Sequence, residues 1–171
     1  MDRVPHVVFL CTGNAARSVM AGAMLAAKAE GVKITTAGTH VIEGQPISWR
    51  TRDAMAEVGV AALGHRSRQI TQHDLDADLI VALAREHVQW IRRQHPEAAA
   101  RTATLRRLCR ELPDEPGPLP TRIATLDLDH VELEPWEDVD DPAGGDVDTF
   151  IACARDLLHL VNELAPRLDI R

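Results

Sequence analysis

The stretch VVFLCTGNAARS, residues 7–18, decides the fold of this 171-residue chain. It opens with four consecutive apolar residues, two of them β-branched, which predict a short buried strand. From Arg17 apolar residues recur at helical spacing through about Lys28, which predicts a helix. Between them lie Gly13 and Asn14, residue types that accept a positive φ at low cost. A tight loop before a helix start gathers backbone N–H groups, so the stretch predicts an anion-binding cradle.

The two ends of this loop carry candidate catalytic groups. Cys11 begins it and Arg17 closes it, in the pattern Cys-x5-Arg-Ser. Inward-pointing amides, a helix N-terminus and a guanidinium all favour the nucleophilic thiolate of Cys11, although a buried structural cysteine beside an unrelated arginine is the alternative. The planar fork of Arg17 can hold two oxygens of one phosphate, and Ser18 can donate a hydrogen bond to the sulfur. The predicted substrate-binding loop consists of Thr12, Gly13, Asn14, Ala15, Ala16, Arg17 and Ser18.

Length, charge and cysteine content narrow the class of protein. A chain of 171 residues predicts one domain over residues 1–171. The net charge of −7 argues against a nucleic-acid partner. The three cysteines show no spacing typical of a zinc site or a disulfide framework, so neither a metal nor a cofactor is expected. The apolar run near the N-terminus is too short for a signal peptide or a membrane span, and a reactive thiol suits a reducing compartment. We therefore expect a cytoplasmic protein without a membrane partner.

Strands alternate with helices along the chain, which predicts parallel β-α-β units with helices on both faces of one sheet. In such sheets the site lies beyond the C-terminal ends of the strands. Residues 110–146 hold six prolines and many acids, and predict a long Pro-rich acidic loop with one ordered piece near 121–133. The further expected strands are 32–37, 78–83 and 102–108, and the further expected helices are 46–58, 71–74, 85–95 and 147–164.

Residues 8–21, VFLCTGNAARSVMA, resemble the phosphate loop of the low-molecular-weight protein tyrosine phosphatase family, which includes arginine phosphatases and thioredoxin-coupled arsenate reductases. The resemblance implies a three-layer α/β sandwich of the phosphatase I type, with a four-stranded parallel sheet in the order 2-1-3-4. The likeness continues in the family's order at residues 36–39, 65–71, 76–80 and 141–145, before a final helix.

The resemblance also implies a mechanism without metal or cofactor. Cys11 would accept the phosphoryl group as a cysteinyl phosphate, Arg17 would hold its oxygens, and Asp141 would be the general acid. Asp141 directly precedes Pro142, and its acidic neighbours favour the protonated carboxyl. From the residues alone a solvated acidic turn that caps the last helix is an equal reading, and Asp140 is the second candidate for the acid.

The family keeps polar residues at the positions of Thr36 and His65, which implies that both support the loop, although a surface histidine is an alternative for His65. Four alanines depart from the family pattern, one of them Ala84, where an acidic residue is common. Ala16 replaces a frequent second cysteine, so no neighbouring thiol can trap an oxidised Cys11. Ala15 replaces a larger residue that helps to choose the substrate, and Ala143 stands where an aromatic residue often lines the cleft.

Taken together, the sequence predicts a protein-tyrosine-phosphatase-type phosphomonoester hydrolase. Its expected partners are a phosphorylated protein or a small phosphoester, and some bacterial relatives add a cognate kinase system. One alternative is a protein arginine phosphatase of the same fold. Another is a catalytically silent phospho-binding regulatory module, which the missing aromatic walls favour. An arsenate reductase would need a resolving cysteine pair near residues 80–95, and the sequence has none there.

Overall fold

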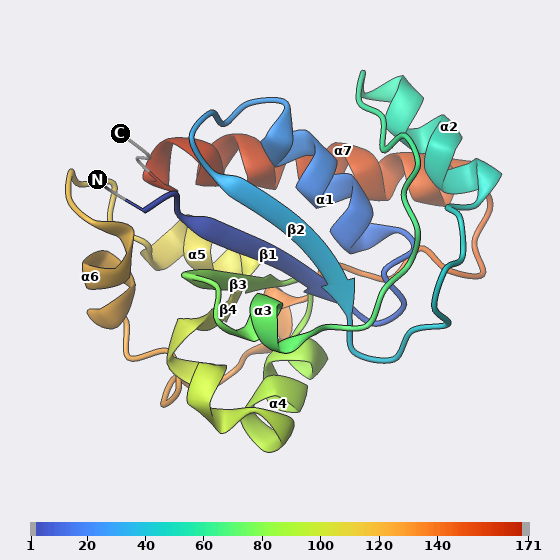
Figure 1. Ribbon diagram of the computed structural model, residues 1–171. Coiled ribbons are helices and arrows are strands. Elements are labelled where there is room, and N and C mark those ends of the chain that lie inside the picture. The colour runs from blue at the N-terminus through green and yellow to red at the C-terminus, as the bar shows by residue number, and fades with distance from the viewer. Residues whose placement is uncertain (1–2, 169–171) are drawn as a thin grey trace.

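A parallel sheet lies between two layers of helices in the computed structural model, which describes residues 3–168 (Figure 1). The strand order is β2-β1-β3-β4, and each neighbouring pair is parallel. This confirms the order and the fold class predicted from the resemblance. The strands are β1 (His6–Cys11), β2 (Lys33–Gly38), β3 (Leu79–Ala82) and β4 (Thr102–Thr104).

The central strand β1 explains why its sequence is an unbroken apolar run. All six of its residues are buried, because helices cover both faces of the sheet. Val7 and Phe9 point into the larger core, whereas Val8 and Leu10 point into the smaller core on the other face. This alternation with a period of two fixes the register, and it brings Cys11 to the C-terminal edge of the sheet beside Gly38.

The helices divide between the two faces (Figure 1). The last helix α7 (Val147–Leu168) packs against α1 (Arg17–Ala26), α2 (Trp49–Glu57) and α5 (Leu105–Glu111) over the larger core. On the other face lie α3 (Gln72–Leu75), α4 (Arg85–Gln94) and the 3₁₀ helix Pro96–Arg101. Within residues 3–168 no helix is both long and apolar enough to cross a membrane.

Several predicted element boundaries differ from the structure, and two of them do so for local reasons. Strand β4 ends at Thr104, not at residue 108, because the Thr104 hydroxyl accepts a hydrogen bond from Arg107 N at 3.2 Å and so caps α5. The helix expected from Pro46 begins only at Trp49, after Ser48 accepts a hydrogen bond from Thr51 N at 3.2 Å. In both cases a hydroxyl cap sets the boundary, whereas the apolar spacing alone leaves it open.

The Pro-rich segment 110–146 has more structure than the single ordered piece expected. It contains α6 (Leu119–Ala124) and the 3₁₀ helix Pro135–Glu137, and α5 extends into its first residues. Its prolines lie between buried apolar side chains that anchor it to the larger core. These anchors are Leu112, Leu119, Ile123, Leu128 and Val139.

Candidate active site

The loop between β1 and α1 has the geometry of an anion cradle. Helix α1 begins at Arg17, and no side chain caps it at Ala16, so the first-turn N–H groups are left without a partner from the helix. Such a helix N-terminus is suited to bind an anion. Of the two residues expected to accept a positive φ, only Asn14 does so, at 52°. The carbonyl oxygens of Cys11 and Thr12 accept hydrogen bonds from the chain after β2, which ties the loop to the neighbouring strand.

The Cys11 sulfur lies at the buried end of this loop, with 3% of the residue exposed. Its Sγ is 2.9 Å from Ser18 Oγ. Because Asn14 Nδ2 donates to the same hydroxyl at 2.9 Å, the Ser18 proton is free to point at the sulfur. The Ser18 hydroxyl can therefore donate a hydrogen bond to the sulfur, which is the interaction expected from the sequence.

Asn14 holds the loop together from inside. Its Nδ2 donates to Thr36 Oγ1 at 3.0 Å, and its Oδ1 accepts from Arg68 N at 3.0 Å. The Asn14 carbonyl accepts from His65 Nε2 at 2.9 Å and from Ser67 Oγ at 2.9 Å. The structure therefore brings Thr36 and His65 against the loop, as the resemblance implies for them. Ser67 and the Arg68 amide are additional braces that the sequence did not single out.

Replacing Asn14 with alanine is expected to lower the free energy of unfolding by about 2–4 kcal/mol, because buried partners lose their hydrogen bonds and alanine is strained at positive φ. The matched variant Asn14→Gly removes the same bonds and tolerates the backbone, so it should be about 1 kcal/mol more stable than Asn14→Ala. Urea unfolding followed by circular dichroism measures both. Equal stability of the two variants would contradict the role of the backbone conformation.

Gly38 at the end of β2 lies against the same loop. A Cβ atom there would come 2.5 Å from Thr12 O and 3.0 Å from Asn14 N, distances that a side chain does not tolerate. The neighbouring strand can approach the loop this closely only because residue 38 is glycine. The sequence places Gly38 in a region of family likeness but gives no sign of this contact.

Arg17 reaches the loop that carries the candidate acid. Its guanidinium is 4% exposed, and Nη1 donates to Val139 O at 2.9 Å. Nη2 lies 3.6 Å from Asp141 Oδ2. Asp141 is half exposed, and its other carboxylate oxygen accepts from Ala143 N at 3.0 Å. Cys11, Arg17 and Asp141, which are far apart in the sequence, therefore meet in one place.

These three residues line a single open cleft of about 380 Å³. Asp140 does not line it and faces neighbouring hollows instead, which favours Asp141 as the acid. The cap of α7 is Asp146, whose carboxylate accepts from Thr149 N at 2.9 Å, whereas Asp141 accepts from Ala143 N in a turn before that helix. The other residues of the cleft are Gly13, Ala15, Ala16, Ser48, Arg50, Thr51, Ala143, Gly144, Gly145 and Phe150.

The sequence missed several groups of this cleft that come from distant elements. Thr51 on α2 donates a hydrogen bond to Ala15 O at 3.2 Å. Phe150, which the sequence assigns to the apolar stripe of the last helix, is the aromatic side chain of the cleft wall. His87 on α4 does not line the cleft but contacts the loop, with Nε2 2.9 Å from Thr12 Oγ1. Burial and the charge of Arg17 lower the pKa of His87 to about 3, so the imidazole is neutral at pH 7.

The loop that carries Asp141 is anchored by a buried carboxylate. Glu137 is fully buried and accepts hydrogen bonds from Arg107 Nε at 2.9 Å and from Thr104 Oγ1 at 2.9 Å. One residue further on, Asp138 pairs with Arg85 at 2.9 Å. These contacts fix the two residues that directly precede Val139, whose carbonyl in turn holds Arg17.

We expect acid to weaken the fold through this anchor. Burial by itself raises the pKa of Glu137, but hydrogen bonds from Arg107, from Glu134 N and from Thr104 outweigh it, so the pKa lies below its ordinary value of 4.5. A lowered pKa contributes stability that is present above the ordinary value and is lost as the pH falls through the folded value. The free energy of unfolding should therefore fall below about pH 4.5. In Glu137→Gln this dependence should be shallower, because the titrating group is gone; urea unfolding between pH 3 and pH 7 measures it. Parallel pH curves for the two proteins would contradict the assignment.

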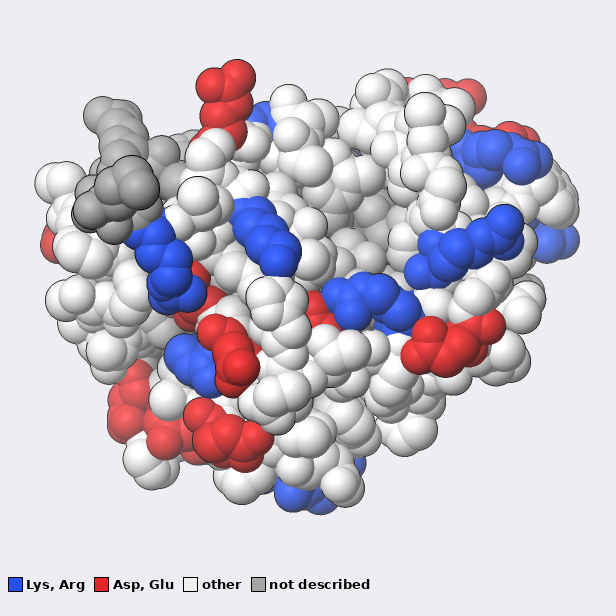
Figure 2. All heavy atoms as spheres, in the orientation of Figure 1, with Lys and Arg blue, Asp and Glu red and all other residues white. Residues whose placement is uncertain are grey.

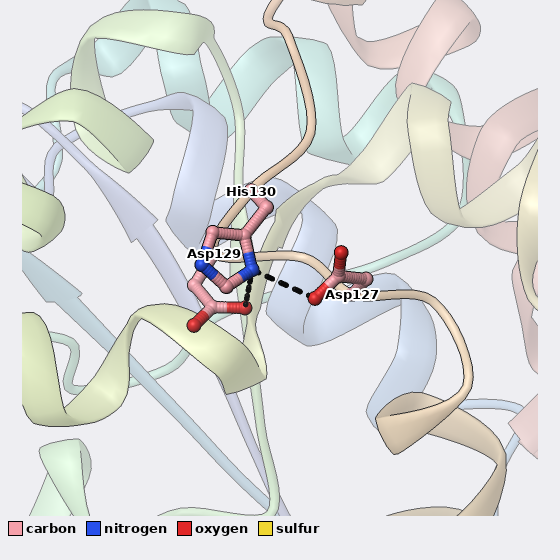
Figure 3. A group of neighbouring side chains, drawn as sticks. All are labelled: Asp127, Asp129 and His130. Atoms are coloured by element: carbon pink, nitrogen blue, oxygen red, sulfur yellow. Dashed lines mark hydrogen bonds and ion pairs between the residues drawn. The ribbon is translucent and has the colours of Figure 1, made fainter.

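One exposed group has side chains of the kind that bind metals (Figure 3). His130 Nδ1 lies 2.8 Å from a carboxylate oxygen of Asp127 and 3.3 Å from one of Asp129. The hydrogen bond to Asp127 raises the pKa of His130, which favours the imidazolium and balances one of the two carboxylates. The three residues do not line the cleft around Cys11, and their contacts with one another account for the cluster.

Charge is spread unevenly over the face shown in Figure 2. Acidic side chains gather at the lower left, whereas Lys and Arg lie along the middle and at the end of the molecule where α2 is. The whole chain carries a net charge of −7. An anionic substrate would therefore be attracted by local groups around the cleft and not by the overall field.

Comparisons with known proteins agree with this geometry. Residues 6–116 match the family model described as low molecular weight phosphotyrosine protein phosphatase. The chain is similar to a protein-arginine-phosphatase of Geobacillus stearothermophilus, with 30% identity over 96% of both chains. It is also similar to the low molecular weight protein-tyrosine-phosphatase Etp of Escherichia coli K12, with 32% identity over 56% of this chain and 66% of that protein. Among solved structures, the YwlE arginine phosphatase from Geobacillus stearothermophilus superposes with a TM-score of 0.76 and 30% identity, covering 96% of this chain and 92% of that one.

Proposed function

Because this chain belongs to the low molecular weight phosphotyrosine protein phosphatase family, we propose that it hydrolyses phosphomonoesters through a phosphoryl group carried on Cys11. Membership makes it a cysteine-dependent phosphatase of the protein-tyrosine-phosphatase type. We propose the residues that carry out the reaction and the substrate on which they act.

The proposed reaction has two displacements at phosphorus. The Cys11 thiolate attacks the phosphorus atom, the bond to the leaving oxygen breaks, and Asp141 gives that oxygen its proton. Asp141 then takes a proton from water, whose oxygen attacks phosphorus while the S–P bond breaks, and phosphate leaves. The loop amides and the Arg17 guanidinium stabilise the charge on the three equatorial oxygens throughout.

One observation carries this proposal: Cys11, Arg17 and Asp141 line the same cleft, and the Ser18 hydroxyl lies 2.9 Å from the Cys11 sulfur. A silent phospho-binding module would need the loop amides and Arg17 alone. The additional presence of a hydrogen-bonded thiol and a carboxyl at the mouth of the cleft supports catalysis.

Phosphotyrosine in proteins is the substrate that we propose. The cleft of about 380 Å³ is open, and Phe150 offers an aromatic contact for a phenyl ring. A second candidate, phosphoarginine, is favoured by a specific observation. Glycines and alanines, including Ala15 and Ala143, form much of the cleft wall, and they supply no aromatic stacking. The similarity in sequence and in structure to arginine phosphatase of Geobacillus stearothermophilus points the same way.

Hydrolysis of matched peptides that carry phosphotyrosine, phosphoarginine or phosphoserine tests the proposal. We expect kcat/KM to be higher for phosphotyrosine than for phosphoserine. The side chain of phosphoserine is shorter, so its phosphate cannot reach the loop at Cys11 while the peptide backbone stays outside the cleft. Higher kcat/KM for phosphoarginine would establish the second candidate. No hydrolysis of any of the three, combined with binding of inorganic phosphate, would establish the silent module.

The proposed substrate also suggests the setting of the reaction. A phosphorylated protein must be supplied by a phosphoryl transfer, so a cognate kinase system is the proposed counterpart. With alanine at position 16 no thiol adjoins Arg17 in the loop, and a thiolate at Cys11 persists best in a reducing compartment. We therefore propose a cytoplasmic location.

A further inference from the structure

A second guanidinium lines the cleft in addition to Arg17. Arg50, near the start of α2, contributes to its wall. Its Nε is buried, yet this atom has no hydrogen-bond partner among residues 3–168. The guanidinium lies over the ring of its neighbour Trp49, 4.7 Å from the ring centre, and Trp49 itself is 49% exposed.

The lack of a partner sets Arg50 apart from other partly buried arginines. Arg107 pairs with Glu137 and Glu111, and Arg17 is held by Val139 O. In the described part of the chain, by contrast, no carboxylate forms an ion pair with Arg50. A desolvated guanidinium N–H without an acceptor is costly unless a ligand supplies one.

The positive charge of Arg50 acts on the carboxylate of Asp146. Its pKa is lowered by the hydrogen bonds from Thr149 first and, among smaller causes, by the charge of Arg50. Its carboxylate is already engaged, because it accepts from Thr149 N and from Thr149 Oγ1, both at 2.9 Å, at the start of α7. Arg50 therefore keeps donors available to a second anion beside the one held by Arg17.

We propose that Arg50 determines specificity by binding a carboxylate of the substrate, namely an Asp or Glu side chain next to the phosphorylated residue. This inference rests on the proposed function and names the class of phosphoprotein on which it acts. The phosphoryl group occupies the loop and Arg17, while the neighbouring acidic side chain reaches the planar fork of Arg50 in the same cleft. The overall charge of −7 repels an acidic peptide, so its recognition requires such a local cation.

The test compares two phosphotyrosine peptides that differ only in Asp or Asn directly beside the phosphotyrosine. For the unmodified protein we expect kcat/KM to favour the Asp peptide on the order of tenfold, mainly through KM, because a hydrogen bond between charged groups is lost with Asn. In Arg50→Gln this ratio should fall to about one, and in Arg50→Lys to an intermediate value. The ratio is taken within each variant, so a general loss of activity does not affect it.

Arg52→Gln is the matched control. Arg52 lies two positions along the same helix, is exposed, and does not line the cleft, so this variant should keep the preference for the Asp peptide. Raising the salt concentration from 0.05 to 0.5 M should weaken the preference in the unmodified protein and leave Arg50→Gln unchanged. The inference is overturned by equal kcat/KM for the two peptides, or by a preference that survives in Arg50→Gln.

These measurements distinguish a failure of the role of Arg50 from a failure of the proposed phosphatase function. Turnover of both peptides at equal rates would leave the phosphatase intact and remove the role of Arg50. If neither peptide were hydrolysed, calorimetric titration of the same two peptides into the protein would still measure the preference: tighter binding of the Asp peptide that is lost in Arg50→Gln supports the inference, and equal affinities overturn it.

Discussion

Replacement of Cys11 by serine is expected to reduce kcat for 4-nitrophenyl phosphate by on the order of 10⁴–10⁶, the scale of loss when a covalent nucleophile is removed. The hydroxyl of serine stays protonated at neutral pH, and a protonated hydroxyl is a far weaker nucleophile toward phosphorus than the sulfur of cysteine. The fold should survive, because the change is nearly isosteric at a buried position and the contact with Ser18, 2.9 Å in the unmodified protein, can be made by an oxygen. Release of 4-nitrophenol measures the activity, and thermal unfolding checks the fold.

The other two thiols provide the control for this variant. Burial raises the pKa of Cys109 to about 11 and that of Cys153 to about 12, so both stay protonated and unreactive at neutral pH. Cys153→Ser should therefore keep its activity, and iodoacetamide at neutral pH should label Cys11 first. Vanadate, which resembles phosphate, should protect Cys11 from this labelling. A Cys11→Ser protein that turns over at the unmodified rate would refute the nucleophile.

The part of the site that could be predicted is the part that is local in sequence. Cys11, Asn14 and Ser18 lie within one loop, and the switch from strand to helix periodicity is enough to place them together. The sheet was predictable for a similar reason. The strand at 7–11 is apolar on both faces, which predicts a strand buried under helices on both sides, whereas the strand order was implied only by the family resemblance.

Contacts between elements that are far apart in the sequence could not be predicted in this way. Arg17 is oriented by a backbone carbonyl 122 residues away, and any residue at position 139 provides such an oxygen. Arg50 lines the cleft because α2 packs against α7, yet its local sequence resembles an ordinary solvated helix start. Thr104 ends a strand through its hydroxyl, while the residues after it keep an apolar pattern compatible with either structure. Packing between distant elements decides all three.

Replacing Asp141 with asparagine is expected to lower kcat on the order of 10²- to 10⁴-fold, the usual contribution of a general acid. Asparagine has nearly the same shape and can still accept the hydrogen bond from Ala143 N, which is 3.0 Å long in the unmodified protein, so the loop should keep its place. The loss should be larger for phenyl phosphate than for 4-nitrophenyl phosphate, because 4-nitrophenolate leaves more readily without a proton. The two rates are measured by release of inorganic phosphate.

Asp140→Asn is the sharpest control, since it removes the adjacent carboxyl from outside the cleft and should cost little activity. If Asp140→Asn lost most of the activity and Asp141→Asn kept it, Asp140 would be the acid. The geometry argues otherwise, because only Asp141 lies both in the cleft with Cys11 and within 3.6 Å of Arg17. A phosphoryl group bound to Arg17 therefore has its leaving oxygen beside Asp141. If the Asp141 carboxyl delivers the proton there, the rate of Asp141→Asn should depend more strongly on leaving-group acidity than the rate of the unmodified protein does. A dependence on the leaving group that is the same in Asp141→Asn and in the unmodified protein would show that this residue transfers no proton.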